Sequence, residues 1–371
     1  MKHFVQLTCL ATGLFGFAAP AFAADVSDML AEIRSKHNIP ALAAAAVQGE
    51  ELIAIGATGV RQVDRPEKVT IDDQWHIGSC TKSMTATLAA MLVEENKLKW
   101  DSTIGDVLPS MRSKMRPAWK GVTLEQLLRH RSGAPGEAPR DLWAEAYKAR
   151  GMPKQQRLDF VRGLLEREPQ EPPGKKFIYS NQGYAIAGAM LEHVAGMPWE
   201  ELMQRRIFAP LGMKGAGFGP PGSATRVDEP RAHVIRDDKL QPIPPGPNAD
   251  NPAAIGPAGT VHCAIGDLAR YAAAHAREGR GAHALLKPES FAKLHSAGEG
   301  EDYAMGWGVT KRGWAGGTTL THTGSNRLWF AVMWVAPAKD AAFVAATNVA
   351  GRDAEKACDE AVASLIGRYL K

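Results

Sequence analysis

The sequence predicts a mixed α/β fold of the α+β kind, with one mostly antiparallel sheet built from both ends of the chain. Strand patterns gather near residues 41–57 and again near residues 303–347. The middle of the chain, about residues 95–255, has the pattern of helical pieces joined by loops rich in proline and glycine. We therefore expect helices to flank the sheet and the middle of the chain to form an all-helical lobe.

The N-terminal part supplies a helix, a hairpin and a second helix. Residues 25–37 repeat apolar side chains at helical spacing, and the apolar runs 41–47 and 52–57 follow with a Gly-Glu turn signal between them. Helical spacing returns from Ser79 and predicts a long helix that is buried along one side. We expect this long helix to lie between the sheet and the helical lobe.

The middle of the chain carries further helix signals. Thr123 and Gln126 have the spacing of a capping box, in which the two residues satisfy each other's backbone N–H at a helix start. Helical patterns also cover residues 183–194 and 198–207, and glycine and proline separate them. These signals favour the all-helical lobe.

Strand signals return near the C-terminus. Residues 303–310 and 318–323 are short strand candidates, and the runs 328–335 and 341–347 flank a turn and predict a hairpin. An apolar stripe over residues 358–369 predicts a last helix. We expect the first and last helices to cover one face of the sheet.

The first 23 residues form a separate segment. They combine a short positive start, an apolar run and small residues before an expected cleavage after Ala23, which predicts a secretory signal peptide. The protein is therefore expected to be secreted or periplasmic, with no integral membrane segment once the signal is removed. The rest is expected to form a single domain, residues 24–371, with a sheet lobe of about 24–90 and 260–371 and a helical lobe of about 91–259.

Composition narrows the class of partner. The chain has 371 residues, 45% of them hydrophobic, and a net charge of +4 without any block of like charge, so we expect no nucleic-acid partner. Cys80, Cys263 and Cys358 are far apart and lack zinc-site spacing, so buried thiols are expected, although one disulfide stays open. No metal or other cofactor is expected, and the oligomeric state stays open.

Ser79 and Lys82 form a Ser-x-x-Lys motif at a helix start. A serine there meets free backbone N–H groups and the positive end of the helix dipole, which favour developing negative charge. Residues three apart share a helix face, so the Lys82 amine can reach the Ser79 hydroxyl. The motif alone also fits an ordinary helix start, which is our interpretation of a second copy at residues 290–293.

Two more triplets follow in order. Tyr179-Ser180-Asn181 precedes a helix, and His322-Thr323-Gly324 ends a strand candidate, with Ser325 next. Taken singly, Tyr179 could be an aromatic residue in a loop, Asn181 a helix cap and His322 a strand residue with an ordinary hydrogen bond. Taken together after Ser-x-x-Lys, they match the motif order of serine penicillin-recognising enzymes.

On these motifs the chain resembles the serine β-lactamase-related family, which includes class C β-lactamases, D,D-peptidases and family VIII carboxylesterases. The stretches "LLRHRSG", "IFAPLGMKGAGF" and "PAGTVHCAIGDLARY" extend the resemblance over most of the chain beyond the signal. It implies a β-lactamase/D,D-peptidase-like fold and a serine hydrolase that works through a Ser79 acyl-enzyme.

The resemblance also implies a role for each motif residue. Ser79 would attack a carbonyl carbon, and Lys82 and Tyr179 would share the proton transfers. Asn181 would orient Lys82 and bind a substrate amide. The strand side of the cleft would hold His322, which would support Tyr179, together with Thr323, Gly324 and Ser325, whose backbone N–H would complete an oxyanion hole with that of Ser79.

The substrate is expected to be a small molecule or a peptide. Familiar β-lactamases begin the third motif with lysine, and a neutral His322 attracts a substrate carboxylate less strongly. This favours an ester or a D-peptide as the substrate. Arg327, just past the motif, is a candidate for the positive charge that lysine supplies in β-lactamases. Arg131 has no assigned role. A true β-lactamase or D,D-carboxypeptidase is one alternative. The other is a penicillin or cell-wall peptide binding or sensor module without turnover.

Overall fold

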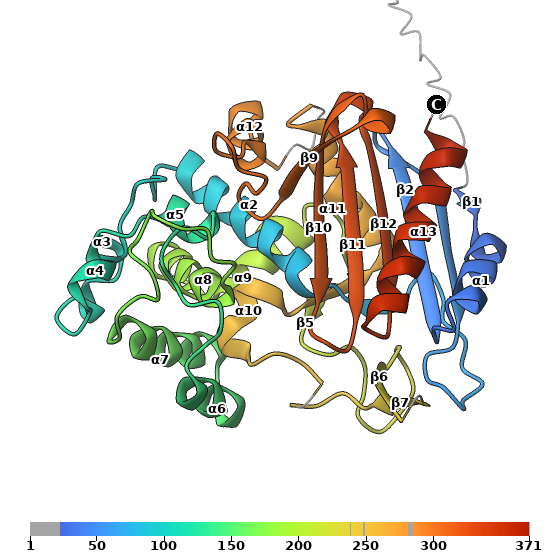
Figure 1. Cartoon of the computed structure of the whole chain (residues 1–371), viewed down its shortest axis with the longest axis horizontal. Coiled ribbons are helices and arrows are strands. Elements are labelled where there is room, and N and C mark those ends of the chain that lie inside the picture. Colours follow the sequence, from blue (N-terminus) through green and yellow to red (C-terminus); the bar gives the residue numbers. More distant parts are fainter. Residues whose placement is uncertain (1–22, 238, 248, 281–284, 371) are drawn as a thin grey trace, which may run out of the picture.

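The computed structural model describes residues 23–237, 239–247, 249–280 and 285–370, and Figure 1 shows how its elements are arranged. The predicted signal peptide lies outside the described residues except for Ala23. Within the described ranges, no helix is long and apolar enough to cross a membrane.

The main sheet contains strands from both ends of the chain, as predicted. Its order is β1-β3-β2-β12-β11-β10-β9, and β1 and β3 are the parallel pair among antiparallel ones. The pairing of β2 with β12 joins the two halves of the sheet. The strands are β1 Ala24–Asp25, β2 Ala41–Gln48, β3 Glu51–Gly59, β9 Gly308–Arg312, β10 Gly317–Ser325, β11 Phe330–Ala336 and β12 Ala341–Thr347.

Strand β2 is mostly alanine, and its side chains alternate between two cores. Odd-numbered residues belong to the core on one face of the sheet, and Leu42 and its even-numbered neighbours belong to the other. Small side chains let helices pack closely on both faces. The helices are α1 Ser27–Lys36 and α13 Arg352–Tyr369 on one face and α11 Ile265–Arg277 on the other. The prediction that the first and last helices share a face is confirmed (Figure 1).

Helix α2, Thr81–Glu94, runs between the sheet and the helices of the middle of the chain (Figure 1). The capping box of Thr123 and Gln126 is present at the start of α5. The other helices on that side are α3 Ile104–Val107, α4 Pro117–Lys120, α5 Leu124–Leu128, α6 Arg140–Lys148, α7 Pro153–Leu165, α8 Asn181–Ala195, α9 Trp199–Met203 and α10 Gly256–Gly259; α12, Pro288–His295, follows α11.

Two local expectations were wrong. Residues 303–307 do not extend strand β9, because Gly306 has a φ of +79° and a Cβ there would lie 2.5 Å from the Ser83 Cα. The chain bends at this close contact with α2. In addition, the stretch expected to be all-helical contains strands. They are β5 Gly217–Phe218, which pairs with β8 Val261–Ala264 beside β4 Gln74–His76, and the hairpin β6 Ala232–Arg236 and β7 Lys239–Ile243.

Leu30 tests the docking of α1 on the sheet. Its side chain is fully buried in the core between α1, α13 and the sheet. We expect Leu30→Ala to lower the free energy of unfolding by about 2–5 kcal/mol, because it leaves a cavity in this core. Urea denaturation followed by circular dichroism measures the change.

Glu32→Ala is the matched control, because Glu32 is exposed on the same helix. It should change the free energy of unfolding by no more than about 0.5 kcal/mol. Equal urea midpoints for Leu30→Ala and the unmodified protein would contradict this packing.

Candidate active site

Ser79 lies in a short 3₁₀ turn, Gly78–Cys80, between β4 and α2. Gly78 has a φ of +49°, and a Cβ at this position would lie 2.4 Å from the Ser325 backbone nitrogen. A Cβ at Gly324 would lie 1.9 Å from the Ile77 carbonyl oxygen. Only glycine fits at both positions. The two glycines therefore let the Ser79 turn and the end of β10 lie against each other.

Lys82 points from the first turn of α2 toward Ser79. Its Nζ lies 3.0 Å from Ser79 Oγ, and it donates to Asn181 Oδ1 at 2.7 Å and to the Ala258 carbonyl oxygen at 2.8 Å. The side chain is fully buried. Helix α2, helix α8 and helix α10 thus meet at one amine.

Burial lowers the pKa of Lys82 to about 7, because the charged amine loses its hydration. The Asn181 and Ala258 oxygens that accept its hydrogen bonds carry no charge. A neutral amine has two protons and one lone pair. When the neutral amine donates its two N–H hydrogen bonds to Asn181 Oδ1 and the Ala258 carbonyl oxygen, its lone pair is left to accept from the Ser79 hydroxyl.

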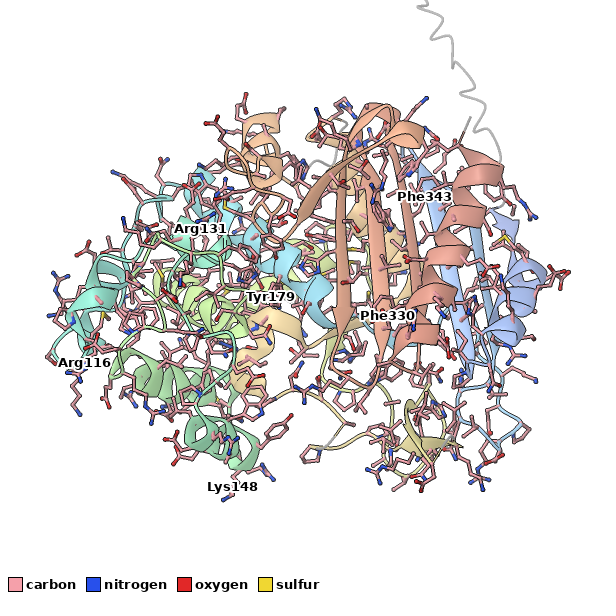
Figure 2. The ribbon with its side chains drawn as sticks, in the orientation of Figure 1. Arg116, Arg131, Lys148, Tyr179, Phe330 and Phe343 are labelled. Carbon is pink, nitrogen blue, oxygen red and sulfur yellow. The ribbon has the colours of Figure 1, made fainter. Side chains whose placement is uncertain are left out.

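Tyr179 lies over the same amine, in the middle of the molecule (Figure 2). The Lys82 Nζ is 4.8 Å from the centre of its ring. Loss of hydration raises the pKa of the Tyr179 phenol well above its usual value, although 39% of the residue is exposed, and a hydrogen bond with Ser79 opposes the rise. The phenol therefore stays protonated near neutral pH and can act as a proton donor.

Asn181 is the first residue of α8 and not its cap. The cap is Ser180, whose Oγ accepts from the Gly183 backbone N–H at 3.1 Å and donates to the Pro135 carbonyl at 2.7 Å. The Ser180 N–H donates to Nδ1 of the buried His130 at 3.0 Å. These bonds fix the helix start and leave the Asn181 amide free to hold Lys82.

The His322 ring makes its side-chain hydrogen bond with Tyr303. Its ring is buried, with Nε2 3.2 Å from the Tyr303 hydroxyl and Nδ1 2.6 Å from the Thr323 carbonyl oxygen. The centre of the Tyr179 ring is 6.4 Å away, so the polar partner of His322 is Tyr303 and not Tyr179. Burial lowers the pKa of His322 to about 3, which keeps the ring neutral.

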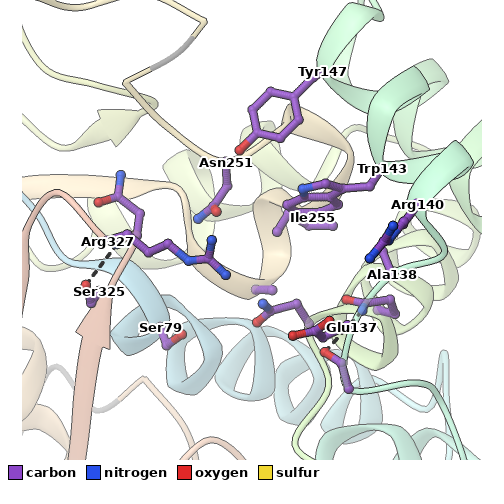
Figure 3. A pocket seen from close by; sticks show the side chains of 15 residues that line it. Ser79, Glu137, Ala138, Arg140, Trp143, Tyr147, Asn251, Ile255, Ser325 and Arg327 are labelled. Carbon is purple, nitrogen blue, oxygen red and sulfur yellow. Dashed lines mark hydrogen bonds between the residues drawn. The ribbon is translucent and has the colours of Figure 1, made fainter. Parts of the chain in front are cut away.

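A cavity of 380 Å³ opens beside Ser79 (Figure 3). Of the expected site residues, Ser79, Asn181 and Ser325 line it, whereas Thr323 does not, and its side chain is exposed. The guanidinium of Arg327 extends into the middle of the cavity (Figure 3). Its opposite wall comes from Glu137, Arg140, Trp143 and Tyr147.

Sequence reasoning missed this opposite wall and the contact between Tyr303 and His322. The wall residues belong to no motif. The one signal in the sequence was the pair of aromatic residues Trp143 and Tyr147, whose i, i+4 spacing places them on one face of α6. Arg131, which had no assigned role, forms an ion pair with Glu301 and so links two loops.

Cys80, Cys263 and Cys358 are free and buried, as expected. In the part of the chain that the structure describes, no group of three or more metal-binding side chains forms.

Comparisons with known proteins identify the family of the chain. A Beta-lactamase family model matches residues 24–366. Penicillin-binding protein 4 of Amycolatopsis lactamdurans is 29% identical over 330 residues, which are 85% of this chain and 82% of that protein. Unguisins hydrolase ungD of Aspergillus violaceofuscus is 29% identical over 262 residues, which are 68% of this chain but 43% of that protein.

The fold is shared with solved structures. The octameric penicillin-binding protein homologue from Pyrococcus abyssi has a TM-score of 0.74 at 23% identity, over 92% of this chain and 76% of that chain. The predicted β-lactamase/D,D-peptidase-like fold is confirmed by this likeness and by the family model.

The lowered pKa of Lys82 predicts a pH dependence. Below pH 7 the amine is protonated and cannot accept the Ser79 proton, whereas above pH 7 it is neutral and can. We expect the acylation rate of Ser79 by a neutral nitrophenyl ester to rise through a midpoint near pH 7. Stopped-flow measurement of nitrophenol release gives the profile.

Lys82→Arg serves as the comparison variant, because a guanidinium stays protonated at these pH values. We expect it to lower the acylation rate by about 10²–10⁴-fold at pH 8. A flat profile between pH 6 and pH 8 in the unmodified protein would contradict a neutral Lys82.

Proposed function

This chain belongs to the β-lactamase family and is a serine hydrolase, and we propose that it cleaves an ester, D-peptide or amide substrate through an acyl-enzyme on Ser79. One observation carries the proposal. The Lys82 amine lies 3.0 Å from Ser79 Oγ in a buried site that lowers its pKa to about 7. A serine with a neutral amine at this distance is an activated nucleophile.

The acylation step follows from the hydrogen bonds. Lys82 accepts the hydroxyl proton while Ser79 Oγ forms a bond to the substrate carbonyl carbon. The carbonyl oxygen gains negative charge and lies at the junction of the Ser79 turn and β10, where the backbone N–H groups of Ser79 and Ser325 are the proposed oxyanion donors. Asn181 and Ala258 hold Lys82 in place during the transfer.

Tyr179 completes the proton path. Its protonated phenol donates to the leaving group as the bond to the carbonyl carbon breaks, and the proton now on Lys82 replaces it. Water then takes the place of the leaving group, and the same steps in reverse release the acid from Ser79. The raised pKa of Tyr179 supports Lys82, not Tyr179, as the base of the resting enzyme.

The cavity supports a substrate with a negative group near the bond that is cut. His322 is neutral and turned toward Tyr303, whereas the exposed Arg327 extends into the cavity with Ser79. A D-peptide with a free carboxylate fits this charge, and a relative named as a penicillin-binding protein supports that class. A β-lactamase or D,D-carboxypeptidase is therefore the second candidate activity.

The site favours turnover over a binding or sensor module, because Lys82, Tyr179 and Asn181 are all in place around Ser79. We also propose that the chain is exported, on the signal-peptide pattern of residues 1–23. N-terminal sequencing of the protein from the periplasm or medium would test cleavage after Ala23.

Ser79→Ala tests the proposed nucleophile. We expect a loss of at least about 10³-fold in kcat with an unchanged circular dichroism spectrum, since only the attacking oxygen is removed. The assay uses nitrocefin, a short-chain nitrophenyl ester and a D-alanyl-D-alanine peptide. Full activity of this variant on any substrate that the unmodified protein cleaves would end the proposal.

Arg327→Ala tests the charge preference. It should lower kcat/KM for the carboxylate-bearing peptide by about 10-fold or more, because a charged hydrogen bond is lost, and change the value for the neutral ester little. Arg65→Ala, an exposed arginine outside the cavity, is the control. An equal loss on both substrates would exclude Arg327 as the carboxylate receptor.

A further inference from the structure

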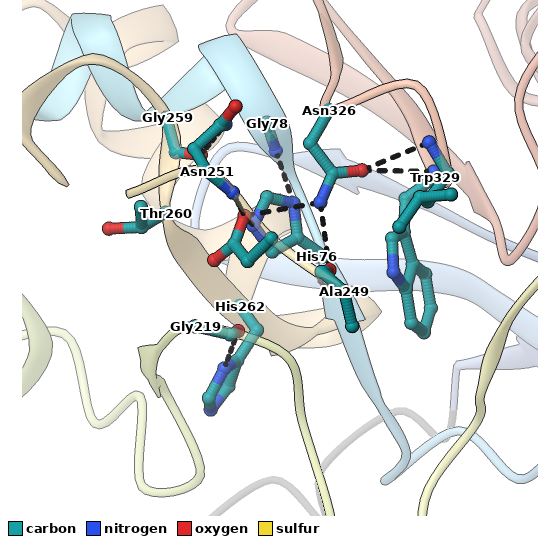
Figure 4. A network of polar contacts seen from close by, with 12 residues as sticks. His76, Gly78, Gly219, Ala249, Asn251, Gly259, Thr260, His262, Asn326 and Trp329 are labelled. Atoms are coloured by element: carbon teal, nitrogen blue, oxygen red, sulfur yellow. Dashed lines mark hydrogen bonds and ion pairs between the residues drawn. The ribbon is translucent and has the colours of Figure 1, made fainter. Parts of the chain in front are cut away.

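A buried polar network lies behind the Ser79 turn (Figure 4). Its centre is Asp250, a nearly buried residue in the loop that precedes α10. His76, the last residue of β4, is completely buried, and its Nε2 lies 2.7 Å from Asp250 Oδ1. The mechanism proposed above uses neither side chain.

The His76 ring shapes the turn that holds Ser79. Its Nδ1 accepts the backbone N–H of Gly78 at 3.2 Å. A ring nitrogen that accepts has no proton, so the ring proton is on Nε2, which contacts Asp250 Oδ1 at 2.7 Å without the alignment of a hydrogen bond. His76 therefore connects the left-handed Gly78 turn to the carboxylate.

The same carboxylate oxygen reaches the other side of the oxyanion hole. Asp250 Oδ1 accepts from the Asn326 Nδ2 at 3.1 Å and from the Asn251 backbone N–H at 2.7 Å. Asn326 directly follows Ser325, and its Oδ1 accepts the backbone N–H groups of Leu328 and Trp329 at 3.2 Å each. Asn326 thus sets the turn after β10.

A third connection leads toward Lys82. The Asn251 Nδ2 donates to the Gly259 carbonyl oxygen at 3.1 Å, next to Ala258, which accepts from Lys82. One carboxylate oxygen therefore links three segments of the site: the nucleophile turn, the end of β10 and helix α10.

We propose that His76 and Asp250 are positioning residues for acyl transfer, whose contact holds the Ser79 turn in register with Ser325 so that the two oxyanion N–H groups converge. This inference rests on the proposed function. Because an oxyanion hole acts on the transition state, a loss of alignment should lower kcat and leave KM nearly unchanged. A misplacement of about 1 Å costs on the order of 10²-fold in rate.

The test measures kcat and KM for the nitrophenyl ester in His76→Phe, Asp250→Ala, Asp250→Asn and the double variant His76→Phe/Asp250→Ala. We expect each of the two disruptive single changes to lower kcat by about 10²-fold with KM within about twofold. The double variant should be no slower than the worse single one, because both changes break the same link. Asp250→Asn keeps an Oδ1 acceptor and should recover most of the rate.

His233→Phe is the matched control. His233 is also completely buried and also joins two segments, through the Val63 N–H and the Asn348 carbonyl, but none of these residues lines the cavity. It should lower the melting temperature without lowering kcat. If Asp250→Ala does not fold, Asn326→Ala, which removes one donor to the same oxygen, should lower kcat about 10-fold at unchanged KM.

The outcomes separate the two proposals. Ser79-dependent hydrolysis with unchanged kcat in the His76 and Asp250 variants overturns the positioning role alone. Equal losses of kcat in Asp250→Asn and Asp250→Ala, or in His233→Phe and His76→Phe, also overturn it. Absence of Ser79-dependent hydrolysis in the unmodified protein is instead a failure of the proposed function.

Discussion

The site depends on one amine that is kept out of water. Lys82 is fully buried, and its hydrogen-bond acceptors are an amide oxygen and a backbone carbonyl oxygen, which carry no charge. Lysine placed against a carboxylate would stay protonated and could not take a proton from Ser79. The surroundings of Lys82 thus decide whether the Ser-x-x-Lys motif is a helix start or a catalytic pair.

Contacts elsewhere in the fold hold Asn181 Oδ1, the Ala258 carbonyl oxygen and the Ser79 turn in place. Thr85 donates to the Pro257 carbonyl oxygen at 2.7 Å and anchors α10 on α2. The buried Arg157 on α7 contacts Glu192 at 3.4 Å and Glu200 at 2.7 Å, and it donates to the Ala253 carbonyl just before α10. Since α2 lies between the helices and the sheet, the reactive serine sits where both parts of the fold meet.

Local patterns predicted much of this arrangement. The alanine run of β2, the capping box at Thr123 and the Ser-x-x-Lys spacing depend on residues close in sequence, and the structure has the strand, the helix start and the contact of Lys82 with Ser79. The contact of Asn181 with Lys82 joins distant segments and was implied by the family resemblance. What could not be predicted depends on distant contacts. The partner of His322 is Tyr303 because the chain bends at Gly306 against α2, and no local pattern contains that contact.

The protonation state of Lys82 decides whether Ser79 is activated, and NMR spectroscopy can observe it. In protein labelled with ¹³C at lysine Cε, the signal that disappears in Lys82→Met identifies this residue, and its chemical shift can be followed from pH 5 to pH 11. We predict a midpoint near pH 7. A midpoint near the ordinary lysine value of about 10.4 would contradict it, because the amine would then be charged at neutral pH and could not activate Ser79.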